Sequence, residues 1–229
     1  MSETVKDMLF GLYEFGCTFL PFAVAAFLLF AVRSEKSRSG EGEAPAENGF
    51  HKYAHIVALG ARLLFGAYVA AVFRVTGSGT LYDLLRCGFD TRSVNLLPFS
   101  DADFDPIGYV LNVVMCIPFG ILVPFIWKGV RSFPRVIAAG ALFSLLIEAS
   151  QLLTFRSTDV DDVILNTLGA AIGYGIFRLC AVLARRLFRC PVLPDSAGIV
   201  GWTGSILLLF AGRFFLFNGI GAASILHGF

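Results

Sequence analysis

The chain has 229 residues, of which 56% are hydrophobic and only 15% are charged, and its mean hydropathy is +0.75. A single soluble core cannot bury so large an apolar fraction, so a lipid bilayer must cover much of the molecular surface. The formal net charge of +1, without a basic stripe interleaved with aromatic residues, argues against a nucleic-acid partner.

Six apolar windows are long enough to cross a membrane, because a helix needs roughly 20 apolar residues to traverse about 30 Å of hydrocarbon. In chain order these windows are residues 8–32, 55–75, 108–128, 134–155, 163–183 and 198–217. They predict an all-α fold, a polytopic transmembrane helical bundle of about six helices. Residues 34–54 begin with a stretch rich in Ser, Gly, Glu and Lys, which predicts a flexible cytoplasmic linker.

The basic residues of the connections predict the orientation, because loops rich in Lys and Arg tend to stay in the cytoplasm. One set of connections carries Arg33, Lys36, Arg38, Lys52, Lys128, Arg131, Arg135, Arg185, Arg186 and Arg189. The other set carries Lys6, Arg74, Arg86, Arg92 and Arg156, together with Arg213 if that side chain snorkels outward. This bias places both termini outside the cytoplasm and makes residues 76–107 and 156–162 extracytoplasmic.

Glu148 is the clearest polar residue at membrane depth, where a carboxylate is costly unless it is paired or faces a cavity. It stands about seven residues before the end of the fourth window, which places it roughly 10 Å below the outer end of a helix. Ser144 and Gln151 fall on the same helix face, which should point into the bundle. Glu148 is then either a proton acceptor or ligand for a headgroup or cation, or a hydrogen-bonded strut between helices.

A dense polar turn separates the fourth window from the fifth, with Arg156, Asp159, Asp161 and Asp162 followed by Asn166 one turn inside the helix. Acidic residues suit the positive end of a helix dipole, but capping alone does not require three carboxylates beside an arginine. Two chemistries fit this composition. The carboxylates of Asp159, Asp161 and Asp162 could hold a divalent cation that grips a phosphate, or Arg156 could hold an anionic headgroup while an acid handles protons.

Two asparagines extend this polar set. Asn95 lies in an apolar segment that Pro98 interrupts, and Asn112 lies about one turn inside the third window. Under the predicted topology all the polar residues fall in the outer half of the membrane, so we expect one outward-facing pocket. Its expected members are Asn95, Asn112, Glu148, Gln151, Arg156, Asp159, Asp161, Asp162 and Asn166.

Two other features of the windows carry no predicted chemistry. Arg62 stands nearer the cytoplasmic side of the second window and receives no role. Gly169 and Gly173 form a small-xxx-small face, a pattern that is typical of close contact between membrane helices.

Many of these residues stand in the order that is seen in VanZ-like proteins: Asn95-Leu-Leu-Pro-Phe99, Asn112, Ile117-Pro-Phe-Gly120, Glu148-Ala-Ser-Gln151, Arg156, Asp159, Asp162, Asn166-Thr-Leu-Gly169 and Gly173. The chain therefore resembles the VanZ-like family, and the resemblance implies a four-helix membrane domain over residues 55–184. Residues 1–33, an N-terminal transmembrane helix, and residues 185–229, a loop and a C-terminal transmembrane helix, are then additions. Asp161 has no assigned place in the family pattern.

The resemblance implies a multi-pass protein of the bacterial cytoplasmic membrane, in a family of which some members are linked to reduced susceptibility to teicoplanin and related lipoglycopeptides. It marks as candidate catalytic residues Glu148, Asp159 and Asp162. It marks as candidate substrate-binding residues Asn95, Asn112, Gln151, Arg156 and Asn166. Three hypotheses remain open: an outward site that binds or modifies a lipid-linked envelope component, a lipid transporter or flippase, and a non-catalytic scaffold for envelope enzymes.

Overall fold

The computed structural model of the protein describes residues 2–38, 45–87, 94–95, 97–99, 106–154, 158–188 and 201–227. Within these ranges, five helices are long and apolar enough to cross a membrane, and a bent helix pair near the C-terminus makes a sixth candidate. This confirms the predicted all-α polytopic bundle of about six helices.

The helices in chain order are α1 (Glu3–Arg38), α2 (Pro45–Thr76), α3 (Leu81–Cys87), α4 (Pro106–Ile126), α5 (Phe133–Gln151), α6 (Val160–Phe188), α7 (Trp202–Leu216) and α8 (Gly219–His227). A short 3₁₀ turn, η1 (Lys128–Val130), connects α4 to α5. Two strands of two residues each, β1 (Val94–Asn95) and β2 (Thr158–Asp159), precede α4 and α6 respectively.

Two of the long helices extend into the segment that composition predicts to be a linker. α1 continues to Arg38 and α2 begins at Pro45, while residues 39–44 lie outside the described residues. The apolar span of α1 ends at Val32, and the helix continues beyond it to Arg38. Polarity therefore marks where the chain leaves the apolar layer, not where the helix ends.

α3 is a short helix within residues 76–107, where the sequence predicted no regular structure. Its start is fixed by a capping box, in which Asp83 N donates to Thr80 Oγ1 at 3.2 Å and Thr80 N donates to Asp83 Oδ2 at 2.9 Å. Gly77 ends α2 with a φ of 65°, which glycine adopts without a steric penalty. The chain continues into α3 after this break, and α2 and α3 together form one candidate span, residues Ala54–Arg86.

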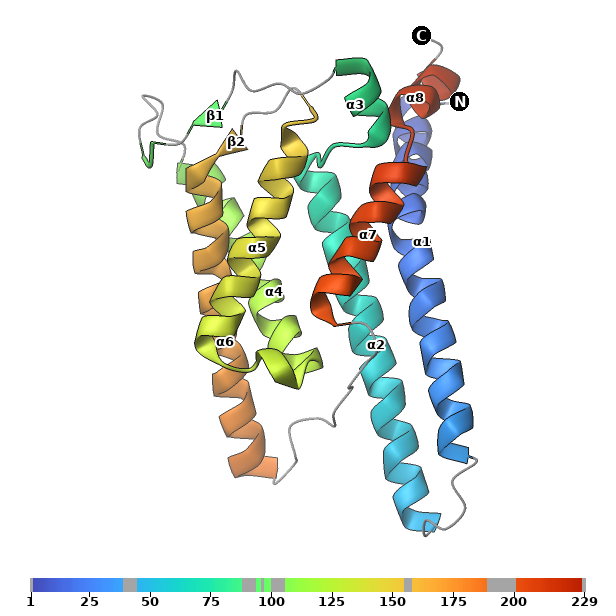
Figure 1. The fold of residues 1–229 in the computed structure, drawn as a ribbon, viewed down its shortest axis with the longest axis vertical. Helices are drawn as coiled ribbons and strands as arrows, with labels where there is room; N and C mark the ends of the chain where they lie inside the picture. The colour runs from blue at the N-terminus through green and yellow to red at the C-terminus, as the bar shows by residue number, and fades with distance from the viewer. Residues whose placement is uncertain are drawn as a thin grey trace.

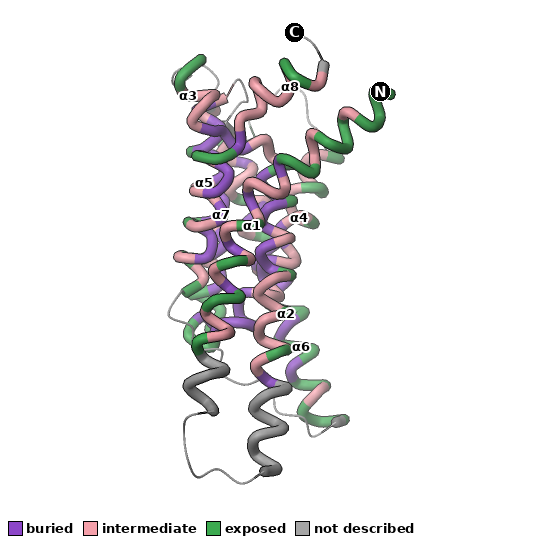
Figure 2. Tube along the Cα trace, turned by 90° about the vertical axis from the view of Figure 1, so that its right-hand side faces the viewer, coloured by how far each residue is buried: buried purple, intermediate pink, exposed green. Residues whose placement is uncertain are grey.

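Figure 1 shows α4, α5 and α6 on one side of the bundle and α1, α2 and α7 on the other. The start of α1, the end of α8 and the strands β1 and β2 all lie at one end, which we call the polar end (Figure 1). The turn η1 lies at the opposite end (Figure 1). Figure 2 shows that buried segments gather in the middle of the bundle.

Aromatic side chains form the core in which the two sides of the bundle meet. Phe119 of α4 stacks on Phe143 of α5 with 4.8 Å between ring centroids and 5° between the ring planes. Phe65 of α2 packs edge-on against Trp127 at 5.1 Å, and Leu209 of α7 is fully buried in the same cluster. These contacts join α2, α4, α5 and α7 into one unit.

Glycines allow α4 and α6 to approach each other closely. A Cβ atom on Gly169 would collide with the carbonyl oxygen of Val113, and one on Gly173 with that of Ile117. Gly120 of α4 is equally confined, against the carbonyl oxygen of Ala170. The small-residue face predicted on the fifth window is therefore confirmed as a helix-packing surface.

The last predicted window, residues 198–217, contains α7 and ends where the structure has a break, and the sequence predicted no helix beyond it. α7 ends at Leu216, and α8 leaves at an angle of 48° after Phe217 and Asn218. The side chain of Asn218 accepts a hydrogen bond from Gly221 N at 2.8 Å, which caps the new helix.

Arg213 does not snorkel toward water, which was one reading of the sequence. The residue is 4% exposed, and its Nε donates to Ser78 O at 2.8 Å. Its guanidinium also pairs with Glu14 of α1. This buried pair makes the long outward reach unnecessary, because a charge that is paired inside the protein does not need bulk water.

Candidate functional site

The predicted polar residues come together at the polar end, where α5 ends and where α4 and α6 begin. The parallel pairing of β1 with β2 organises this region by setting Val94 opposite Thr158 and Asn95 opposite Asp159. Asn95 Nδ2 lies 3.4 Å from Asp159 Oδ2. Two segments that are far apart in the sequence are thereby brought to one place.

Glu148 lies inside the bundle, as its predicted helix face requires. Ser144, Glu148 and Gln151 are 0%, 4% and 5% exposed, so the whole face is buried. The Oε2 atom of Glu148 accepts a hydrogen bond from Asp159 N at 3.1 Å. The carboxylate of α5 therefore anchors the main chain of β2.

Asp159 and Asp161 fix the turn that leads into α6. Asp161 N donates to Asp159 Oδ1 at 2.9 Å, which satisfies one of the free amide groups at the start of the helix. Asp161 is 1% exposed and accepts hydrogen bonds from Phe99 N at 2.9 Å and from Tyr109 Oη at 2.8 Å. Phe99 has a φ of 52°, so this bond holds it in the left-handed region that non-glycine residues seldom adopt.

Asp162 and Asn166 face the helices on either side of α6. Asn112 Nδ2 of α4 donates a short hydrogen bond to Asp162 Oδ1. Asn166 Nδ2 donates to Ser144 Oγ of α5 at 2.9 Å. The Oδ1 atom of Asn166 is buried and has no hydrogen-bond partner within the described part of the chain, so this amide retains an unused acceptor.

A cavity of about 300 Å³ lies between α2, α4, α5 and α6 at this end. Its polar lining consists of Thr76, Asn112, Gln151 and Asp162. Gln151 Nε2 donates to the carbonyl oxygen of Thr76 at 3.0 Å, which ties the end of α5 to the end of α2. The volume of the cavity lies at the lower end of the range for sites that hold small molecules.

The cavity gathers only part of the set that the sequence assigned to one pocket. Asn112, Gln151 and Asp162 line it. Asn95, Glu148 and Asp159 instead bond to one another around the strand pair, because the carboxylate of Glu148 is engaged by a main-chain amide. Asn166 faces Ser144, and Arg156 lies outside the described residues. The roles of these residues remain predictions.

The three carboxylates suggested for a divalent cation face different partners. Asp161 accepts hydrogen bonds from Phe99 N and Tyr109 Oη, and Asp162 accepts one from Asn112 Nδ2. Asp159 accepts one from the main-chain amide of Asp161. Among the residues that the structure describes, no three His, Cys, Asp or Glu side chains are arranged to hold a metal ion. The described geometry therefore gives no support to a cation at this turn.

Two members of the site were not singled out from the sequence. Tyr109 stands three residues before Asn112, so the two share a face of α4, and this spacing is the signal that identifies it. Thr76 contributes its main-chain carbonyl oxygen to Gln151. A carbonyl oxygen is common to every residue, so the sequence holds no signal for that contact.

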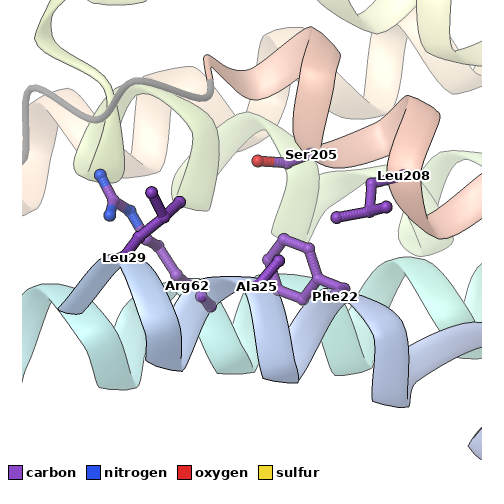
Figure 3. A pocket seen from close by; sticks show the side chains of 7 residues that line it. Phe22, Ala25, Leu29, Arg62, Ser205 and Leu208 are labelled. Carbon is purple, nitrogen blue, oxygen red and sulfur yellow. The ribbon is translucent and has the colours of Figure 1, made fainter. Parts of the chain in front are cut away.

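Arg62 lies apart from the polar end, in a small cavity between α1, α2 and α7. Figure 3 shows its side chain with those of Phe22 and Leu29 from α1 and of Ser205 and Leu208 from α7. The cavity has a volume of about 20 Å³, which is room for little more than one water molecule. This cavity is too small for a lipid headgroup.

The fold and the site define a class: a multi-pass helical membrane protein with a hydrogen-bonded cluster of carboxylates and amides at one end of its spans. Residues 63–182, more than half of the chain, match the family model described as VanZ/LLP1, and the protein belongs to that family. The matched residues contain all the predicted site residues, whereas α1, α7 and α8 lie outside them.

A curated relative is similar to the chain over a shorter stretch. Protein VanZ of Enterococcus faecium is 33% identical over 101 residues, which make up 43% of this chain and 61% of that protein. The similarity therefore spans less than two thirds of the relative. No solved structure matches the chain.

Proposed function

We propose that this protein binds or modifies a lipid-linked component of the bacterial cell envelope at a pocket on the outer face of the cytoplasmic membrane. The observation that carries this proposal is the cavity lined by Thr76, Asn112, Gln151 and Asp162. Polar side chains at membrane depth are rare, and a cavity on which several of them converge is a preferred position of a functional site.

The hydrogen-bond network around the cavity supports a site that is held rigid before its ligand binds. Asp162 is oriented by Asn112, and Gln151 by the main chain of Thr76. Both contacts cross between helices, so neither side chain can turn away without breaking a bond. A preorganised arrangement of this kind lowers the entropy that a ligand loses on binding.

In this proposal, the carboxylates provide the chemistry and the amides provide the positioning. Glu148 acts as the acid or base, with Asp159 and Asp162 as the further candidates. Arg156 holds an anionic headgroup, since a guanidinium binds phosphate with two parallel hydrogen bonds. Asn95, Asn112, Gln151 and Asn166 orient the ligand or the catalytic groups.

The proposed outer location follows from the distribution of basic residues. Arg131 and Arg135 flank the start of α5, and Arg185 and Arg186 lie near the end of α6, both at the end opposite the polar cluster. Positively charged ends of spans tend to remain in the cytoplasm. The polar end then faces the outside of the cell.

The test measures which lipids remain bound to the purified protein in mild detergent, by native mass spectrometry. The variants are Asp162→Asn and Glu148→Gln, and the control is Glu3→Gln, which changes an exposed carboxylate at the start of α1. We expect the wild type and Glu3→Gln to retain one defined lipid class. Asp162→Asn should lose it, and Glu148→Gln should lose it or retain a chemically altered form.

The outcome that contradicts the proposal is the same nonspecific lipid profile in all four proteins, provided that they unfold at similar temperatures. That result would favour the scaffold hypothesis, in which helix faces matter more than the polar cluster. The same variants can be expressed in a teicoplanin-sensitive bacterium. We expect wild type and Glu3→Gln to reduce teicoplanin susceptibility and the two site variants to have no effect.

A further inference from the structure

The rim of the polar cavity differs in character from its interior. Four apolar residues complete the lining: Val75 of α2, and Leu111, Val114 and Met115 of α4. Val75, Leu111 and Val114 are 68%, 60% and 53% exposed, whereas Gln151 is 5% exposed. The cavity therefore has a polar interior, buried at Gln151 and half-buried at Thr76, Asn112 and Asp162, and an exposed apolar rim.

The exposed rim lies near the polar end of two candidate membrane spans. Val75 is the next to last residue of α2, and Leu111 and Val114 stand in the second and third turns of α4. Apolar side chains exposed at this level of a span lie beside lipid, close to the headgroup region of the bilayer. The rim is thus a side opening toward the bilayer between α2 and α4.

A hydrogen bond closes the opening toward the middle of the membrane. Tyr68 Oη of α2 donates to Met115 O of α4 at 2.9 Å. Tyr68 stands two turns before Val75 on α2, so α2 and α4 are tied together on the inner side of the opening and not along it. The opening therefore has a fixed inner limit.

We infer that the ligand reaches the site sideways from the bilayer, through the opening between α2 and α4, and that it is a membrane lipid, not a water-soluble precursor. Its headgroup contacts Asn112, Gln151 and Asp162, and its hydrocarbon chain lies over Leu111 and Val114. This inference rests on the proposed function. It adds the class of ligand and the path by which the ligand arrives.

The chemistry of the lining supports an amphiphilic ligand. The Oε1 atom of Gln151 is buried without a hydrogen-bond partner among the described residues, so the interior retains an acceptor for a hydroxyl or amine group. A headgroup of a few heavy atoms fits the volume of about 300 Å³, whereas its chain does not need to enter. The exposed rim gives that chain an apolar surface on which it stays in contact with the bilayer.

The opening can be blocked without touching a polar residue. Leu111→Trp and Val114→Trp place a bulky apolar side chain on the rim, and Val110→Trp is the matched control. Val110 lies on the same helix and is 61% exposed, but it does not line the cavity. Because all three positions face lipid, the bilayer tolerates tryptophan equally at each of them.

The readout is the amount of the defined lipid retained by each purified protein, measured by native mass spectrometry. We expect the two rim variants to retain about tenfold less lipid than wild type, which corresponds to about 1.4 kcal/mol of binding free energy. Val110→Trp should retain the wild-type amount. Equal retention in all three tryptophan variants would overturn the side path while leaving the proposed function intact.

A second measurement does not depend on the folding of the tryptophan variants. A photoreactive benzoylphenylalanine is placed at position 114 or at position 110, and the lipids that crosslink in cell membranes are identified. We expect position 114 to capture the lipid that copurifies with wild type, and position 110 to capture the average lipid mixture. The same set of crosslinked lipids at the two positions would overturn the inference. A wild type that retains no defined lipid would overturn both the inference and the proposed function.

Discussion

Glu14 and Arg213, which stand 199 residues apart, form a buried ion pair with 2.5 Å between Glu14 Oε1 and Arg213 Nη1. The other carboxylate oxygen of Glu14 lies 3.1 Å from Arg74 Nη1 of α2. One carboxylate thus joins three helices, α1, α2 and α7. Since α1 and α7 lie outside the residues that match the family, the pair joins the two additional helices to each other, and the contact with Arg74 fastens them to the matched domain.

Removing the carboxylate should destabilise the protein more than removing Arg213. Glu14→Gln leaves two arginines without their acceptor, whereas Arg213→Met leaves Glu14 paired with Arg74. We expect Glu14→Gln to cost about 3–5 kcal/mol, the usual cost of breaking a buried pair from one side. The measurement is the free energy of unfolding in detergent, and a smaller effect for Glu14→Gln than for Arg213→Met would contradict this assignment.

The close contact of α4 with α6 makes a second prediction at a glycine. Gly173→Ala places a Cβ against the carbonyl oxygen of Ile117, so we expect a loss of about 1–3 kcal/mol through overpacking. Gly175→Ala on the same helix is the control, because nothing lies within 4 Å of its Cβ position. The measurement is the melting temperature of the two variants. Helix propensity favours alanine at both positions, so a lower melting temperature of Gly173→Ala than of Gly175→Ala reports the packing collision alone. Equal melting temperatures would show that α4 can move away at no cost.

Asp161 should control the mobility of the segment around Phe99. Asp161→Ala removes the acceptor of both Phe99 N and the Tyr109 hydroxyl, whereas Tyr109→Phe removes only the second bond. We expect hydrogen exchange at the Phe99 amide to accelerate strongly in Asp161→Ala and only slightly in Tyr109→Phe. Unchanged exchange in Asp161→Ala would show that other contacts hold this segment.

The predicted orientation can be tested with two single cysteines at opposite ends of the bundle. Leu97, two residues after β1, is 70% exposed, and nothing lies within 4 Å of the Cβ position of Gly129 in η1. The chain's own cysteines, Cys17, Cys87, Cys116, Cys180 and Cys190, are first replaced by serine or alanine. In intact spheroplasts, an impermeant maleimide should label Leu97→Cys and spare Gly129→Cys. The reverse pattern would place the polar end in the cytoplasm.

The membrane spans could be predicted because apolar length alone determines them. The fifth window, residues 163–183, falls within α6, and the third, residues 108–128, overlaps nearly all of α4. The sixth window, residues 198–217, contains α7, whereas α8 was not predicted, since it is too short to be a span and its direction depends on how it packs against α1. Hydropathy reports the environment of a helix but not the direction of its axis.

The polar residues could be assigned to one end but not paired. Glu148 binds a main-chain amide, and that partner has no sequence signature. Asp161, which the family pattern left unassigned, is the most buried carboxylate of the turn at 1% exposed. Its partners Phe99 and Tyr109 are distant in the sequence and come near it only when the chain folds, so the sequence did not indicate them. The ion pair of Glu14 and Arg213 could have been predicted, because opposite charges in two apolar spans are usually paired.

The pairing of β1 with β2 also determines when the site forms during synthesis. Asn95 leaves the ribosome before α4 and α5, whereas its partner Asp159 follows both of them. The strand that carries Asn95 must therefore wait for two further spans before its partner exists. A chain that stalls after α5 would insert its first four spans in the membrane and still lack Asp159 and Asp162, so incomplete products are stable membrane helices without the site.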